Sequence, residues 1–172
     1  EIPLQLFKDL LTAYRMDGNQ NRYKDFEELF FYCRHSANPV GRLVLHVFGY
    51  REESLHQLSD KICTALQLAN FWQDIAVDLA KNRIYLPETE MKNFHVTEGD
   101  LHARICNRAF VNLLKYCIER TASLFDAGLP LCSQLGKDLR LEMRLTCLGG
   151  ATILKKIAKN SYDVYRKRPE IT

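Results

Sequence analysis

Glycine and proline are scarce in this chain, with eight and five among 172 residues. Alternation of polar and apolar residues, the pattern typical of strands, is essentially absent, which excludes a sheet as the main architecture. No apolar run approaches the ~18 residues that a membrane-spanning helix needs. The net charge is only +3, which does not indicate a nucleic-acid partner. We therefore expect one soluble helical domain over residues 1–172, long enough to bury a sizeable core.

The cysteines form no C-x-x-C pair, the spacing typical of zinc sites. They are Cys33, Cys63, Cys106, Cys117, Cys132 and Cys147. Several fall on apolar helical faces, so we interpret them as free buried thiols of a cytoplasmic protein. No secretory signal opens the chain. It begins at Glu1 without an initiator Met, so we interpret it as the C-terminal portion of a longer protein or as a chain that has been trimmed.

Apolar residues at helical spacing, separated by turn-forming residues, predict an all-α bundle with its site between helices. The expected helices span residues 3–17, 25–38, 40–49, 54–79, 87–93, 100–127, 131–148 and 151–168. Asp25 and Ser54 are the predicted capping residues of two of them. Pro39 should interrupt the second helix, and Gly149 with Gly150 should separate the last two.

Asn70, Asp74 and Asp78 stand four residues apart. On a helix this step is ~6 Å of rise with little rotation, so all three project from one face, and Gln67 extends the stripe. The neighbouring residues are apolar enough to bury the helix, and the sequence places no cation to pair with Asp74. Mg²⁺ bridging to a diphosphate would satisfy them, because Mg²⁺ prefers carboxylate, amide and phosphate oxygens. The alternative interpretation is a solvated acidic helix face.

Two further segments carry potential chemistry. Arg83 follows the acidic stripe, where a guanidinium can grip the phosphates that metal ions also hold. Residues 32–42 predict a helix kinked at Pro39, and a kink opens a pocket and frees backbone carbonyls. Those carbonyls, together with aromatic rings, can stabilise a carbocation. The alternative is a kinked helix on which Tyr32 only packs.

Basic residues gather near the end of the chain. They are Lys155, Lys156, Lys159, Arg166, Lys167 and Arg168. We interpret them as a solvated helix face, with weak anchoring to an anionic membrane as the second interpretation. The histidines show no metal-ligand spacing.

Three segments together resemble the squalene/phytoene synthase family of trans-isoprenoid synthases. Residues 4–41, ending in Tyr-Cys-x-x-x-Ala-x-x-Val-Gly, look like the middle of that family. Residues 67–87, with Gln-x-x-Asn-x-x-x-Asp-x-x-x-Asp and then Arg-x-Tyr-Leu-Pro, look like its second aspartate-rich motif, and residues 149–169 look like its last helix. The resemblance implies an isoprenoid-synthase-type helical bundle. The family's first Asp-x-x-x-Asp helix has no counterpart in residues 1–30, so the chain looks like the C-terminal two-thirds of such a domain, without its N-terminal helices.

Finer details are similar to the bacterial hopanoid-pathway branch of the family. They are Tyr32-Cys33-Arg34 before Ser36-Ala37-Asn38-Pro39-Val40-Gly41, then Asn70-Phe71-Trp72-Gln73-Asp74, and Gly149-Gly150. That branch includes hydroxysqualene synthases, which convert presqualene diphosphate to hydroxysqualene. The resemblance implies Mg²⁺-assisted ionisation of the diphosphate, cation rearrangement and capture by water. Gln73, Asn38-Pro39 and Gly150 replace the wider family's Arg, Ala-Gly and Tyr, which favours this later step over head-to-head condensation.

The site expected from these segments combines metal, substrate and catalytic residues. The metal ligands are Asn70, Asp74 and Asp78; substrate contacts are Gln67, Phe71, Gln73 and Arg83; catalytic residues are Tyr32 and Asn38; and Phe30, Phe31, Phe71 and Trp72 are candidates to line the apolar pocket. Our hypothesis for Asn38 is that it positions the water that captures the carbocation, with help from Tyr32, because a buried amide needs partners. Alternatively, Asn38 caps the helix broken at Pro39.

Two other functions stay open. One is head-to-head prenyl transfer, as in squalene or phytoene synthases, and the other is a non-catalytic helical protein that binds isoprenoids or acts as a scaffold. The expected cofactor is Mg²⁺ and the expected partner is an isoprenoid diphosphate, with other hopanoid-pathway enzymes as further candidates.

Overall fold

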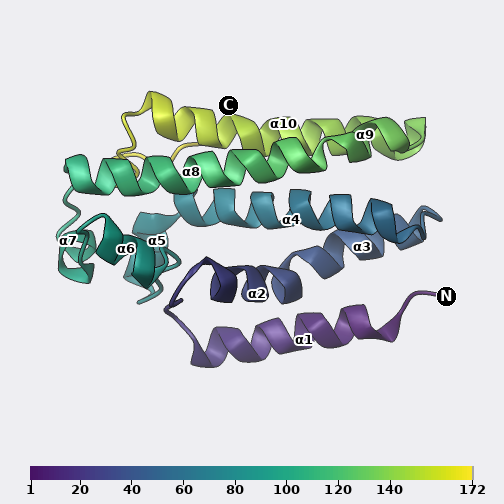
Figure 1. The fold of residues 1–172 in the computed structure, drawn as a ribbon, viewed down its shortest axis with the longest axis horizontal. Coiled ribbons are helices and arrows are strands. Elements are labelled where there is room, and N and C mark those ends of the chain that lie inside the picture. Colours follow the sequence, from purple (N-terminus) through teal and green to yellow (C-terminus); the bar gives the residue numbers. More distant parts are fainter. Residues whose placement is uncertain (172) are drawn as a thin grey trace.

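The computed structural model describes residues 1–171, and these contain α-helices and no strands (Figure 1). The helices are α1 (Leu4–Asn19), α2 (Phe26–Ser36), α3 (Asn38–Val47), α4 (Glu53–Gln73), α5 (Ile75–Ala80), α6 (Glu88–Asn93), α7 (Glu98–His102), α8 (Arg108–Gly128), α9 (Pro130–Gln134) and α10 (Lys137–Lys159). The all-α prediction is therefore confirmed. None of the helices in these residues is both long and apolar enough to span a membrane.

Helix α4 lies at the centre of the bundle. Figure 1 shows α8 and α10 on one side of it and α2 and α1 on the other, with α5 to α7 gathered at one end. The fully buried indole of Trp72 donates a hydrogen bond of 2.8 Å from Nε1 to Thr121 Oγ1. This bond satisfies a polar group that would otherwise be costly to bury, and it ties α4 to α8.

Most residues predicted to begin or end a helix in the N-terminal half do so in the structure. Asp25 caps α2 by accepting a 2.9 Å hydrogen bond from the Glu28 amide. Pro39 interrupts the helix, because α2 ends at Ser36 and α3 begins at Asn38. The predicted cap at Ser54 is wrong, since α4 already begins at Glu53 and has no side-chain cap.

The helix predicted over residues 54–79 is broken at Asp74, which separates α4 from α5 and has φ −104° and ψ 13°. The Asp74 amide still donates to the Asn70 carbonyl at 2.9 Å, and the Asp78 amide donates to the Asp74 carbonyl at 2.8 Å. The bend therefore leaves the four-residue spacing of the acidic stripe in place. Aspartate favours such sites because its side chain competes with the helical backbone.

The C-terminal half departs further from the expected boundaries. The helix predicted over 100–127 is divided into α7 and α8, and the second of these is capped by Asn107. Gly149 and Gly150 lie inside α10 rather than between helices. A Cβ atom on Gly150 would overlap the Phe125 ring, so this glycine permits close packing of α10 instead of ending a helix. Beyond Lys159 the chain turns back as the C-terminal segment, residues 160–171.

Buried and exposed apolar residues both follow the helical pattern. All six cysteines are free; Cys33, Cys117, Cys132 and Cys147 are buried, Cys63 is partly buried and Cys106 is exposed. The interpretation as free thiols is confirmed, and the predicted burial is found for four of the six.

Two helices carry exposed apolar residues. Helix α1 presents an exposed stripe of Leu4, Phe7, Leu11 and Tyr14, and α10 presents Leu141, Leu145 and Leu148.

Candidate functional site

The acidic stripe lies where α4 meets α5. Asn70 is exposed, and Asp74 and Asp78 are partly buried. Burial raises the pKa of the Asp78 carboxyl, and the nearby charge of Asp74 raises it further, while Lys81 and Arg83 oppose the shift. A half-buried carboxylate beside a second carboxylate forms a place where a cation is stabilised.

Asp74 is paired with a cation that the sequence did not indicate. Arg168, in the C-terminal segment, donates from Nε to Asp74 Oδ1 at 2.5 Å and from Nη2 to Oδ2 at 3.2 Å. The expectation that the carboxylates have no protein partner is therefore wrong for Asp74. The two residues are 94 positions apart, so no local pattern could reveal the pair.

The C-terminal segment is held in place by further contacts. Gln73 is buried, and its side-chain amide donates to the Pro169 carbonyl. Lys156 Nζ donates to the Glu170 carbonyl at 2.5 Å. Gln73 thus fastens the segment in this structure, although we predicted it as a substrate contact. Gln67, also predicted to contact substrate, is partly buried on α4.

An open pocket of about 500 Å³, the α4–α10 pocket, lies between α4, α10 and the C-terminal segment. Its lining residues are Leu66, Ala69, Asn70, Gln73, Gly149, Gly150, Ile153, Arg168, Glu170 and Ile171. Asn70 and Arg168 therefore face the same space, with an apolar wall beside them. A polar head group with an apolar tail is the ligand chemistry that suits such a lining.

Arg83 lies close to Asp78 and to an aromatic cluster. The neighbouring Tyr85 and Asp17 hold the pKa of the Arg83 guanidinium above its usual value. Its Nη2 donates to the Asp17 carbonyl at 3.4 Å, a long contact that leaves most of the guanidinium donors for other partners.

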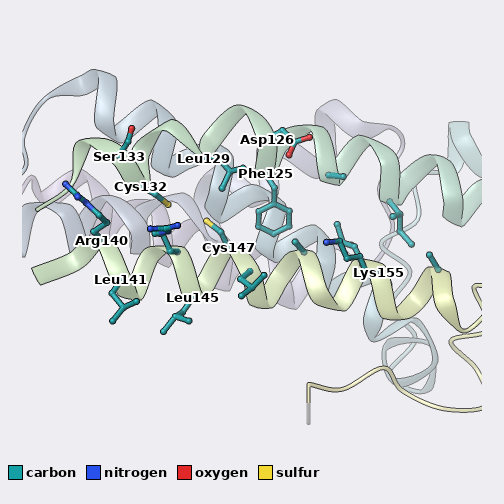
Figure 2. Close-up of a pocket in the computed structure, with 17 residues that line it drawn as sticks. Phe125, Asp126, Leu129, Cys132, Ser133, Arg140, Leu141, Leu145, Cys147 and Lys155 are labelled. Atoms are coloured by element: carbon teal, nitrogen blue, oxygen red, sulfur yellow. The ribbon is translucent and has the colours of Figure 1, made fainter. Parts of the chain in front are cut away.

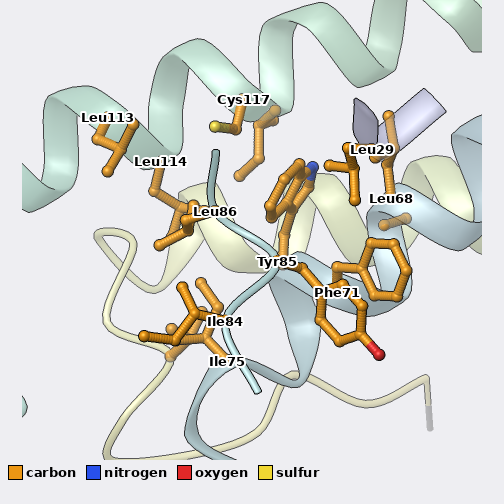
Figure 3. Close-up of a cluster of buried hydrophobic side chains, with 14 of the residues drawn as sticks. Leu29, Leu68, Phe71, Ile75, Ile84, Tyr85, Leu86, Leu113, Leu114 and Cys117 are labelled. Atoms are coloured by element: carbon orange, nitrogen blue, oxygen red, sulfur yellow. The ribbon is translucent and has the colours of Figure 1, made fainter. Parts of the chain in front are cut away.

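The aromatic cluster is built on Tyr32, Phe71 and Tyr85. The Phe71 and Tyr85 rings stack with centroids 3.7 Å apart and planes 7° apart (Figure 3). Tyr32 is 6.1 Å from both rings, and its hydroxyl donates to Asp17 Oδ1 at 2.7 Å. Burial, followed by this hydrogen bond, raises the pKa of Tyr32, so it stays protonated. The electron-rich ring faces could stabilise a cation.

Asp17 is a site residue that the sequence analysis missed. The sequence predicts that the first helix ends at this residue, but α1 continues to Asn19. Its carboxylate and carbonyl therefore come from a helix end that contacts both Tyr32 and Arg83. Two of the aromatic residues predicted to line the apolar pocket lie in different surroundings, because Trp72 is buried in the core and Phe31 is 43% exposed.

Asn38 is buried at the start of α3, and its Oδ1 accepts a 2.9 Å hydrogen bond from Thr64 Oγ1. The position before α3 is held by Ala37, and no side chain caps this helix. Asn38 lines a cavity of about 530 Å³ together with Arg42 and His46. The structure therefore brings Asn38 to α4 but places it in a different cavity from Asn70 and Arg168.

The residues of the acidic stripe could supply some of the ligands of a magnesium ion. Within residues 1–171, no three His, Cys, Asp or Glu side chains gather as a metal-ligand set. The Asp74 and Asp78 carboxylates and the Asn70 amide supply hard oxygen ligands at the point where burial, and then the charge of Asp74, raise the pKa of Asp78. An octahedral Mg²⁺ shell would be completed by phosphate and water oxygens.

Known proteins give an independent comparison. The family model described as squalene/phytoene synthase matches residues 1–172. Hydroxysqualene synthase of Rhodopseudomonas palustris is 39% identical over 141 residues, which are 81% of this chain and 48% of the relative. The 15-cis-phytoene synthase of Synechococcus elongatus is 30% identical over 179 residues, covering 97% of this chain and 58% of the relative. The chain thus spans about half the length of these curated relatives.

A solved structure agrees with the sequence matches. The crystal structure of squalene synthase HpnC from Alicyclobacillus acidocaldarius superposes with a TM-score of 0.91 at 40% sequence identity. The match covers 94% of this chain and 61% of that chain.

Proposed function

The chain belongs to the squalene/phytoene synthase family, and from this premise we propose that it contributes to the ionisation of presqualene diphosphate and the capture of the cation by water, giving hydroxysqualene. The 39% identity to a hydroxysqualene synthase supports this choice within the family. The observation that carries the proposal is the meeting of two carboxylates, Asp74 and Asp78, with two guanidinium groups, Arg83 and Arg168, around one helix end.

This arrangement suits a diphosphate leaving group. Arg83 and Arg168 would hold phosphate oxygens, since guanidinium groups bind phosphate through paired hydrogen bonds. Asn70, Asp74 and Asp78 would hold Mg²⁺, which would supply charge neutralisation of the leaving diphosphate. Binding of the diphosphate by Arg168 would release Asp74 from its present ion pair.

The aromatic cluster would act on the organic part of the substrate. The ring faces of Phe71 and Tyr85 would stabilise positive charge in the apolar chain. The Tyr32 hydroxyl, held by Asp17, would supply a polar group at the edge of this cluster. Exclusion of bulk water by the buried rings would protect the cation from premature capture.

We keep Asn38 as our candidate for positioning the capturing water. The Thr64 hydroxyl fixes Asn38 Oδ1 as an acceptor, which leaves the amide Nδ2 as a donor to water in the lined cavity. This role requires a water path between the cavity at Asn38 and the aromatic cluster. Analysis of the reaction product, rather than a binding measurement, therefore tests it.

Product analysis tests the proposed function. We expect the full-length enzyme, given presqualene diphosphate and Mg²⁺, to release hydroxysqualene, measured by gas chromatography with mass spectrometry. The second candidate is head-to-head prenyl transfer, favoured by the 30% identity to a phytoene synthase. Conversion of two prenyl diphosphates to a cyclopropyl diphosphate or a hydrocarbon would support that candidate, and tight substrate binding without turnover would support a carrier.

A further inference from the structure

Asp17 and Tyr32 form a hydrogen-bonded pair beside the aromatic cluster. The Tyr32 hydroxyl donates to Asp17 Oδ1 at 2.7 Å. Asp17 is in the last turn of α1 and Tyr32 is on α2, so this bond joins two packed helices. Its length is typical of a charge-assisted bond from a hydroxyl to a carboxylate.

This bond fixes the direction of the Tyr32 hydroxyl proton. A phenol has one proton to donate and oxygen lone pairs that accept. Because Asp17 takes the proton, the lone pairs of Tyr32 Oη remain for other partners. Burial and then this hydrogen bond raise the pKa of Tyr32, so its oxygen accepts as a neutral phenol and not as a phenolate.

Aromatic rings surround Tyr32. The ring centroids of Tyr23, Phe71 and Tyr85 lie 5.6, 6.1 and 6.1 Å from its own. Ring carbons do not take up protons in water, so a proton released among these rings leaves through a hydroxyl. Of the three tyrosines, Tyr32 is the one whose hydroxyl is bonded to a carboxylate within residues 1–171.

The Asp17 carboxylate is not neutralised by a protein cation. It forms no ion pair within the described part of the chain. Arg83 donates to the Asp17 backbone carbonyl, not to the side chain. Asp74, by contrast, is held by two hydrogen bonds from Arg168. Asp17 can therefore take up a proton without breaking an ion pair.

We propose that Asp17 is the positioning residue that makes Tyr32 the exit for the proton released when water captures the cation. This inference rests on the proposed function. Addition of water forms a carbon–oxygen bond and gives a protonated alcohol, which loses one proton. Tyr32 Oη accepts that proton while its own phenolic proton passes to Asp17 Oδ1. Tyr32 ends neutral, Asp17 ends protonated, and no electron is transferred. Asn38 concerns where the water stands, whereas Asp17 and Tyr32 determine where its proton goes.

The leaving diphosphate is the competing base for this proton. In the proposed site its charge is opposed by the guanidinium groups of Arg83 and Arg168, and nearby positive charge lowers the proton affinity of an anion. The Asp17 carboxylate has no such partner. This contrast favours Asp17 as the acceptor.

The test is product analysis of the full-length enzyme with presqualene diphosphate, with released pyrophosphate measured in the same samples. Asp17→Asn keeps the size of the side chain and an oxygen for the Tyr32 hydroxyl, but the amide does not take up a proton. We expect the alcohol share of the products to fall about tenfold, with more eliminated or rearranged hydrocarbon, while KM changes less than about twofold. A purely structural role would lower stability and all products alike.

Three further variants sharpen this test. Tyr32→Phe should shift the products in the same way, and adding Asp17→Asn to it should change them no further, because the two residues act in one relay. Asp17→Glu keeps a carboxylate and should recover part of the alcohol share; it also replaces Asp17→Asn if circular dichroism shows that the amide variant does not fold. The matched control is Asp126→Asn, at an exposed aspartate of α8 that lines a separate cavity between α8, α9 and α10 (Figure 2), and it should give the wild-type products.

The outcomes separate this inference from the proposed function. An unchanged alcohol share in folded Asp17→Asn would overturn the relay alone and leave the diphosphate as the base. Additive effects of Asp17→Asn and Tyr32→Phe would also overturn it, since residues with separate roles add. A wild-type enzyme that releases no alcohol would contradict the proposed function itself, and the relay with it.

Discussion

Arg168 and Asp74 form a two-bond ion pair that joins the C-terminal segment to the end of α4, with Nε–Oδ1 and Nη2–Oδ2 distances of 2.5 and 3.2 Å. The Asp74 carboxylate is thus occupied by a protein cation at the place where we propose a metal ion. In the proposed site, Arg168 and Mg²⁺ would therefore compete for one carboxylate until a diphosphate supplied Arg168 with another partner.

Replacing Arg168 tests this competition. We expect Arg168→Gln to bind Mn²⁺, used as a paramagnetic substitute for Mg²⁺, several-fold more tightly in the absence of substrate, as measured by electron paramagnetic resonance. Stability should fall by no more than about 1 kcal/mol, because the pair is partly exposed to solvent. Arg166→Gln, which removes a neighbouring arginine paired with Asp163, is the control. Unchanged or weaker Mn²⁺ binding in Arg168→Gln would show that the pair does not compete with the metal.

The carboxylates of the stripe should be needed for turnover but not for folding. In the full-length enzyme, Asp74→Ala and Asp78→Ala should each abolish product formation at saturating Mg²⁺, since each removes a metal ligand. Circular dichroism should show unchanged helix content. Retained turnover when both aspartates are replaced would refute the metal assignment.

Arg83 should bind the diphosphate rather than stabilise the fold. Arg83→Lys keeps the charge but loses the planar fork, so pyrophosphate affinity should fall by about 1–2 kcal/mol, the scale of a charge-assisted hydrogen bond. Titration calorimetry with Mg²⁺ present measures this change. Lys81→Ala, which removes an exposed cation close to Asp78, serves as the control. If Arg83→Ala bound pyrophosphate normally, the proposed role would have to be abandoned.

Asn38→Ala should change the products if Asn38 positions the capturing water. We expect turnover to persist with less alcohol and more eliminated or rearranged hydrocarbon. Stability should also fall by about 1–3 kcal/mol, because Thr64 loses its buried acceptor. Thr64→Val removes the same hydrogen bond but keeps the amide, so it should cost stability and shift the product ratio less than Asn38→Ala does. An unchanged ratio in Asn38→Ala would reject the water hypothesis.

His46 should make folding depend on pH. Burial, followed by the nearby His56 and Arg51, lowers the pKa of His46 below 6.5, and its Nδ1 lies 2.7 Å from Arg51 Nη1, consistent with a neutral acceptor. Below pH 6.5 the unfolded chain therefore binds more protons than the folded one. The stability that neutral His46 contributes to the folded state should be fully present above that pH. It should decline as the pH falls through the lowered pKa of His46. Urea unfolding between pH 5 and 7.5 measures the slope, which should be smaller in His46→Gln. An identical slope in the variant would assign the pH dependence to other groups.

The features that the sequence predicted correctly depend on residues close together in the chain. The Asp25 cap and the break at Pro39 are set by backbone groups within a few positions, and both occur where expected. The spacing of the acidic stripe is also local, and it survives the bend at Asp74 because the backbone hydrogen bonds on either side persist.

What the sequence did not predict depends on contacts between distant elements. Gly150 was interpreted as a helix breaker, but it stays helical because α10 approaches Phe125 there. Asp17 and Arg168 are site residues only because α1 packs against α2 and the C-terminal segment lies against the end of α4. Spacing along one helix could not show either partner.

The hydrogen bond between Trp72 and Thr121 has a practical consequence. Trp72 is the only tryptophan of the chain and is fully shielded from solvent. Its emission spectrum therefore reports on one place, the contact between α4 and α8. A shift of that emission to longer wavelength signals that these two helices have separated and let water in. A ligand in the α4–α10 pocket, whose lining does not include Trp72, should leave the spectrum unchanged, so a single wavelength scan distinguishes unfolding from occupancy.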